Sequence, residues 1–123
     1  MHILRNFISL CAICGALAVS AQPQVKWLQN VHDFGAFDED MGPVTSTFRL
    51  VNTGTEPLVI VAARATCGCT VPSYTHDPIA PGDTASVEVT YNPAGRPGKF
   101  DKRVKIETNT LPAQSIITIK GVV

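Results

Sequence analysis

The side chains most capable of chemistry in this chain are two cysteines separated by one glycine, Cys67-Gly68-Cys69. In an extended segment, side chains two positions apart project to the same side, so the two sulfur atoms can approach each other. Three states are open for the pair: a disulfide, two reduced thiols buried as small apolar groups, or a soft-metal or redox site. A disulfide across one residue closes a small ring, so we expect it to be strained and readily reduced. Gly68 would then accommodate dihedral angles that a Cβ atom forbids.

A metal site at this pair would need further ligands, because a closed zinc site takes four and copper(I) prefers sulfur. His76 lies a few residues after Cys69, so Cys67, Cys69 and His76 are the candidate ligands. Thiol catalysis requires a base held against the thiolate. His76-Asp77 offers one in sequence, but Pro78 follows and indicates a turn. We therefore predict no catalytic residue and no cofactor, and keep the three candidates only as an alternative.

The other two cysteines, Cys11 and Cys14, have a C-x-x-C spacing typical of redox or metal sites. They lie inside an apolar run, Phe7 to Val19, that follows Arg5 and precedes the small residues Val19-Ser20-Ala21. This three-part pattern is typical of a secretory signal peptide. We predict a signal peptide over residues 1–21, cleavage after Ala21, and one domain over residues 22–123.

The predicted signal peptide places the protein in the periplasm or outside the cell, where disulfides persist. The apolar run is shorter than the ~20 residues of a spanning helix, which disfavours an uncleaved anchor and leaves no stable membrane span after cleavage. Lipoprotein signals place small residues before the modified cysteine. Leu10 precedes Cys11 and Ile13 precedes Cys14, so lipoprotein anchoring is disfavoured.

Composition narrows the function classes further. The 123 residues include 45% hydrophobic and 16% charged residues, with ten basic and ten acidic side chains, as in a globular protein without general affinity for nucleic acid. The run Asp38-Glu39-Asp40 offers oxygen ligands for Ca²⁺ but lacks the spacing of a calcium loop, so a solvated turn is favoured. Five basic residues interleave with Asp101 and Glu107 and indicate a solvated sheet face: Arg96, Lys99, Lys102, Arg103 and Lys105.

Beyond the apolar run, hydrophobic residues recur with period two and are interrupted by Gly, Pro, Asn and Asp, which predicts strands throughout. Asn52 to Thr55 predicts a tight hairpin turn with positive φ angles. Pro57 to Ala65 is apolar on both faces and predicts a central strand. The fold class is therefore all-β, an immunoglobulin-like β-sandwich of seven to eight short antiparallel strands. The expected strands begin near Val25, His32, Val44, Pro57, Cys67, Ala85, Phe100 and Ser115.

Several short strings also resemble a family. They are Phe34-Gly35, Asn52-Thr53-Gly54, Cys67-Gly68-Cys69-Thr70-Val71-Pro72, Pro78-Ile79-Ala80-Pro81-Gly82 and Ile119-Lys120-Gly121. Together they resemble a family of exported bacterial proteins catalogued as a domain of unknown function, across about residues 25–123. The family is similar in fold to immunoglobulin-like modules of the Hydin and major-sperm-protein type. The resemblance implies an interaction or scaffold domain, and it attaches no secure role to the two cysteines. The same lineage suggests Thr84, in Asp83-Thr84-Ala85, as an O-glycosylation acceptor.

The sequence thus predicts an exported, non-enzymatic immunoglobulin-like module that binds a protein or an envelope component. The alternative is a periplasmic thiol protein that handles copper or disulfides through Cys67 and Cys69. The sequence identifies no partner.

Overall fold

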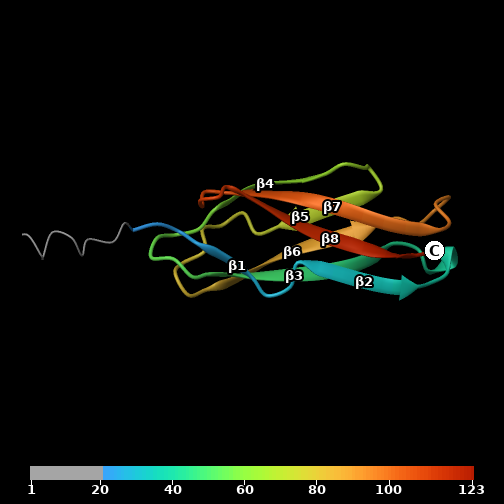
Figure 1. The fold of residues 1–123 in the computed structure, drawn as a ribbon, viewed down its shortest axis with the longest axis horizontal. Coiled ribbons are helices and arrows are strands. Elements are labelled where there is room, and N and C mark those ends of the chain that lie inside the picture. The colour runs from blue at the N-terminus through green and yellow to red at the C-terminus, as the bar shows by residue number, and fades with distance from the viewer. Residues whose placement is uncertain (1–20) are drawn as a thin grey trace, which may run out of the picture.

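The computed structural model describes residues 21–123, which form two four-stranded β-sheets packed face to face (Figure 1). The first sheet has the strand order β1-β3-β6-β5 and the second β2-β8-β7-β4. The strands are β1 Val25–Trp27, β2 Val31–Ala36, β3 Val44–Asn52, β4 Ile60–Ala65, β5 Thr70–Tyr74, β6 Thr84–Tyr91, β7 Lys99–Thr108 and β8 Gln114–Val122, with a 3₁₀ turn, η2, at Glu39–Met41. The predicted all-β sandwich is confirmed.

The predicted signal peptide falls almost entirely on residues 1–20, which include Cys11 and Cys14 and lie outside the described residues. Cleavage after Ala21 therefore stays a prediction. Within residues 21–123, no helix is long and apolar enough to cross a bilayer.

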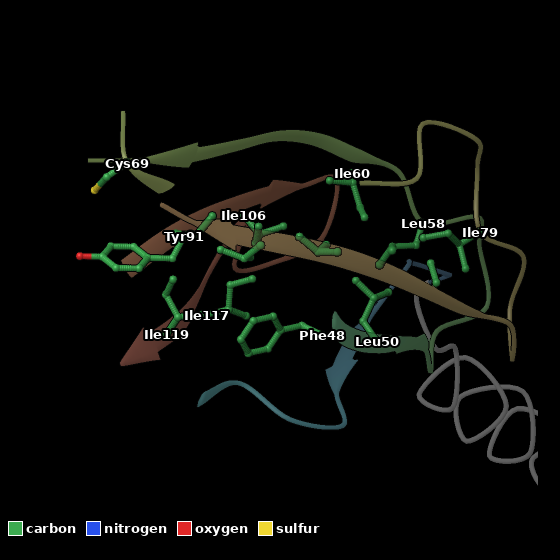
Figure 2. Packing of buried hydrophobic residues seen from close by; sticks show 14 of the residues in the cluster. Phe48, Leu50, Leu58, Ile60, Cys69, Ile79, Tyr91, Ile106, Ile117 and Ile119 are labelled. Atoms are coloured by element: carbon green, nitrogen blue, oxygen red, sulfur yellow. The ribbon is translucent and has the colours of Figure 1, made fainter. Parts of the chain in front are cut away.

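The core lies between the sheets and is built by the period-two patterns. In β6, Ala85, Val87, Val89 and Tyr91 are buried and alternate with more exposed residues. Figure 2 shows the buried side chains in a row along the sandwich, with Cys69 and Tyr91 at one end and Leu58 and Ile79 at the other. Removing such large apolar side chains from water is the main driving force for this architecture.

One strand pair departs from the prediction of antiparallel strands, because β2 runs parallel to β8. The chain leaves β1 at the edge of the first sheet and enters the second sheet within a few residues, without reversing direction. The Thr118 N–H donates to the Asn30 carbonyl at 2.8 Å where the new pairing begins. Two parallel strands need a long connection between them, and here the chain from β3 to β7 connects β2 to β8.

The predicted hairpin at Asn52 to Thr55 is wrong, since β3 and β4 belong to different sheets. Asn52 is fully buried, and its side chain stabilises the crossing, that is, the connection from β3 in the first sheet to β4 in the second. Its Nδ2 donates to the carbonyls of Glu56 at 2.7 Å and Ile79 at 3.0 Å. Its Oδ1 accepts the N–H of Gly54 at 2.9 Å and of Gln24 at 3.4 Å.

Gly54 is required here for space and not for a positive φ. A Cβ atom at this position would lie under 3.0 Å from backbone atoms of Gln22, Pro23 and Gln24, which run alongside. The Thr55 N–H donates to the Gln22 carbonyl at 3.0 Å, so the N-terminal segment is hydrogen-bonded to the crossing.

The prediction of a central strand over Pro57 to Ala65 is also wrong, because β4 is an edge strand that pairs only with β7. Leu58 and Ile60 are buried, but Val61 is 60% exposed. The register shifts between Ile60 and Ala62, which turns Val61 outward. Apolar residues on both faces therefore reflect a bulged edge strand and not coverage on both sides.

We predict that Asn52→Ala lowers the free energy of unfolding by about 2–4 kcal/mol, because it removes four buried or part-buried hydrogen bonds to the backbone of Gln24, Gly54, Glu56 and Ile79. Denaturant titration measures this change. Asn92→Ala is the matched control, since the exposed Asn92 accepts a single hydrogen bond, from the Ala94 N–H at 3.1 Å. Equal losses for the two variants would contradict the role of the buried amide.

Candidate functional site

Cys67 and Cys69 lie in the turn that leads the chain from β4, at the edge of the second sheet, to β5, at the edge of the first. The Thr70 N–H donates to the Cys67 carbonyl at 3.2 Å and closes this turn. The two sulfur atoms are joined in a disulfide, with a Cα–Cα distance of 5.2 Å. Of the three states open from the sequence, the structure shows the first.

The two halves of the disulfide have different surroundings. Cys69 is 2% exposed and belongs to the core, at the end where Tyr91 also lies (Figure 2). Cys67 is half-buried at the margin of that core. The Cys69 N–H donates to the Cys67 Sγ at 3.1 Å, and the Cys69 Sγ lies 3.7 Å from the Thr70 Oγ1. One sulfur is therefore anchored inside and the other lies near the surface.

Gly68 forms the exposed tip between the two cysteines. No atom lies within 4 Å of the position that a Cβ would take, and its φ is outside the left-handed region that favours glycine. The expected role of Gly68, to supply a φ that a side chain forbids, is not supported by the structure. The glycine leaves the tip of the turn uncovered instead.

The disulfide contributes little to the stability of the whole domain. Its sequence separation is 2, and in the chain-entropy model a ring this small stabilises by only about 1–2 kcal/mol, against about 3 for a loop of ~15 residues. It restrains a local turn and does not connect distant parts of the chain.

His76 is not brought to the cysteine pair. It is exposed, with its ring centroid 4.5 Å from that of Tyr74, the last residue of β5. The cysteines precede the first residue of that strand, and four steps of ~3.3 Å separate its ends by roughly 13 Å. Among residues 21–123, no group of three or more His, Cys, Asp or Glu side chains is placed to hold a metal ion.

The acidic run Asp38-Glu39-Asp40 lies in the exposed turn η2 between β2 and β3. The Glu39 Oε1 accepts the Gly95 N–H from the loop between β6 and β7. One of the three carboxylates is thus used to join two loops. The predicted glycosylation acceptor Thr84 is also exposed and is the first residue of β6.

The five basic residues predicted as a cluster do not stay together. Arg103 and Lys105 lie on the outer face of β7, and Arg64 of β4 is directly opposite Lys105. With Thr66, they border a shallow cavity of about 230 Å³ next to the cysteine turn. The others lie apart: Lys99 borders a cavity of about 370 Å³, Lys102 is half-buried, and Arg96 donates to the Ala94 carbonyl at 3.0 Å.

A groove that the sequence did not predict lies between β1 and the connection from β7 to β8. Its volume is about 300 Å³, and its lining includes Val25, Trp27, Thr53, Leu111 and Ser115. The Trp27 Nε1 is buried and has no hydrogen-bond acceptor within the described part of the chain. The single tryptophan of the chain is a signal that could have directed attention here.

Ser115 in the first half of β8 contributes to this groove, and that half of the strand has an unpaired edge. Pairing between β2 and β8 begins only at Thr118, whose N–H points toward Asn30. Backbone groups alternate along a strand, so those of Ile116 and Gln114 point the same way. No other strand of residues 21–123 pairs with them on that side. Ile116 is 45% exposed.

A family model described as "Protein of unknown function (DUF1573)" matches residues 25–123. The chain belongs to this family. A comparison with curated proteins gave no match.

Several solved structures share the fold. A protein of unknown function from Porphyromonas gingivalis W83 is 16% identical, with a TM-score of 0.75 over 88% of this chain and 50% of its own. Our chain thus spans half the length of that relative. The ASH / PapD-like domain 7 of human CEP192 is 17% identical, with a TM-score of 0.59 over 86% and 94%. WR4, an MSP family member from C. elegans, is 10% identical, with a TM-score of 0.53 over 82% and 98%.

These likenesses show a fold of the PapD and major-sperm-protein type for this DUF1573 chain. The expected resemblance to major-sperm-protein domains is confirmed. The resemblance to Hydin-type domains stays a prediction.

We predict opposite outcomes for alanine at two glycines. Gly68→Ala leaves the free energy of unfolding within about 0.5 kcal/mol, because the new Cβ meets no atom. Gly54→Ala lowers it by about 1–3 kcal/mol, because the new Cβ overlaps the backbone of Gln22 to Gln24. Thermal and urea denaturation measure both. A large loss for Gly68→Ala would contradict the open tip of the turn.

Proposed function

We propose that this protein is an exported, non-enzymatic module that binds an extended segment of a protein in the cell envelope by strand addition. The observation that carries the proposal is the unpaired edge of β8 at Gln114 to Ile116, lying beside the groove that contains Trp27. An unpaired strand edge presents backbone donors and acceptors in a row, and the complementary ligand is another extended backbone.

The side chains in the groove suit an uncharged segment. The groove is lined by neutral residues, and Leu111 is 83% exposed at its border. Ile116 is a second exposed apolar side chain, and it borders the neighbouring cavity with Arg64 and Lys105. An incoming strand would gain main-chain hydrogen bonds to β8 and apolar contact with Leu111 and Trp27.

Export is part of this proposal. It is supported by the three-part pattern of residues 1–21 and by the disulfide between Cys67 and Cys69, since disulfides persist mainly in oxidising compartments. The absence of enzymatic activity is also part of it. His76 and Asp77, the pair that sequence offered as a base and its orienting group, lie in an exposed turn away from the cysteines.

We predict that short unstructured peptides selected from a display library shift the fluorescence of Trp27 when they bind. Trp27 is the only tryptophan, so its emission reports on this groove alone. Ile116→Pro removes the outward N–H and should weaken binding by about tenfold or more, which corresponds to about 1.4 kcal/mol.

Val61→Pro is the matched control for this test, because Val61 is an exposed apolar residue at the bulge of another edge strand, β4. It should leave the affinity unchanged, and circular dichroism checks that both variants fold. Some peptides could bind without changing the Trp27 emission and bind equally well to Ile116→Pro. That result would place recognition on another surface and contradict the proposal.

A further inference from the structure

We infer that Cys67–Cys69 is a thiol–disulfide exchange site for cysteine pairs of other proteins, in which Cys67 is the attacked sulfur and Cys69 the leaving sulfur. This goes beyond the proposed strand-binding function and does not depend on it, because the disulfide lies outside the groove at Trp27. The two sites meet at Ile116, which also borders the basic cavity beside the cysteine turn.

The assignment of roles follows from the unequal surroundings of the two sulfurs. An attacking thiolate must approach in line with the bond that breaks, so the sulfur under attack has to be reachable. Cys67 is at the margin of the fold, and the uncovered Gly68 gives access to it. Cys69 is 2% exposed and cannot be approached directly.

Two hydrogen bonds already in place suit the two steps of an exchange. The Cys69 N–H that donates to the Cys67 Sγ at 3.1 Å would stabilise the negative charge on Cys67 when that sulfur is released from the mixed disulfide. The Thr70 Oγ1, at 3.7 Å from the Cys69 Sγ, can hydrogen-bond to the departing sulfur. Neither contact is needed to fold a turn that the bond from the Thr70 N–H to the Cys67 carbonyl already closes.

A basic surface lies next to the turn. Arg64 and Lys105 face each other across β4 and β7, and Arg103 lies on the same side; all three border the cavity that reaches Thr66, the residue before Cys67. Like charges directly opposite each other on a sheet are destabilising. One acidic side chain, Glu107, borders the same cavity, so the three basic side chains outnumber it there. Such a surface attracts thiolates and acidic peptides.

The exchange balances without any further reagent. A thiolate of the partner forms a bond to the Cys67 Sγ, the Cys67–Cys69 bond breaks, and its electron pair leaves on the Cys69 Sγ, which takes a proton. The second thiol of the partner loses its proton, attacks the partner's own sulfur in the mixed disulfide and releases Cys67. The partner dithiol is oxidised by two electrons, and Cys67–Cys69 is reduced to two thiols. The reverse sequence reduces a protein disulfide and restores the pair.

The first test mixes the full chain with synthetic peptides that carry two cysteines, in acidic and basic versions. All proteins carry Cys11→Ser and Cys14→Ser, so only Cys67 and Cys69 react. Acid quenching and mass spectrometry follow oxidised peptide and reduced protein. We expect exchange in the folded state, faster by about tenfold for the acidic peptide at low salt. A disulfide that exchanges only in denaturant, or two free thiols in the air-oxidised protein, would overturn the proposal.

The second test separates the two sulfurs. In Cys69→Ser, the Cys67 thiol should react with a peptide carrying an activated disulfide at least about tenfold faster than the Cys69 thiol does in Cys67→Ser. Cys69→Ala repeats the first measurement in case serine disturbs the core, and circular dichroism confirms folding. Equal rates for Cys67 and Cys69 would overturn the assigned roles.

The third test concerns the basic surface. Lys105→Glu should remove most of the preference for the acidic peptide. Lys26→Glu, which makes the same charge change at an exposed position of β1 in the other sheet, should retain the preference. Equal effects of the two variants would show that net charge alone sets the preference and would overturn the local role of Lys105. Loss of exchange here with intact peptide binding at Trp27 would leave the proposed strand-binding function standing.

Discussion

The buried amide of Asn52 is the interaction on which the arrangement of the sandwich depends. A chain that leaves one sheet for the other must pass its backbone through the core margin, where unpaired polar groups are costly. Asn52 supplies two donors and an acceptor at that point and joins the end of β3 to Gln24, Glu56 and Ile79. With this crossing fixed, Leu58 and Ile79 close one end of the core, and β4 is set at the edge of the second sheet.

The position of β4 in turn determines the character of the next crossing, from β4 to β5. From the edge of one sheet to the edge of the other, the chain needs only the short turn that contains the cysteines, and both β4 and β5 have an open side there. The crossing from β3 to β4 is held by the side-chain hydrogen bonds of the buried Asn52, so it serves the fold. The crossing from β4 to β5 is exposed at Gly68 and is held by a disulfide that stabilises the domain little, so it is available for chemistry.

The sequence predicted what depends on local periodicity and missed what depends on neighbours. The alternation of Val87 and Val89 with polar residues identified β6 to within a residue, because burial of one face imposes period two. The apolar residues on both faces of Pro57 to Ala65 were misassigned to a central strand, because periodicity does not tell a bulged edge from a covered strand. The groove at Trp27 could not be predicted, since its walls, β1 and residues 110–115, are far apart in sequence.

The cysteine pair is a second case in which neighbouring strands, and not the local sequence, decide the outcome. As a string, Cys67-Gly68-Cys69 is symmetric, and side chains two apart in a strand would be equivalent. The register of β5 breaks this symmetry: Thr70 pairs with Tyr91, and the Asn92 N–H donates to the Cys69 carbonyl at 2.8 Å, which ties Cys69 to the core. Cys67 comes before that anchor, in the turn, and remains at the margin. The unequal roles of the two sulfurs therefore arise from a strand partner about twenty residues away and not from the motif itself.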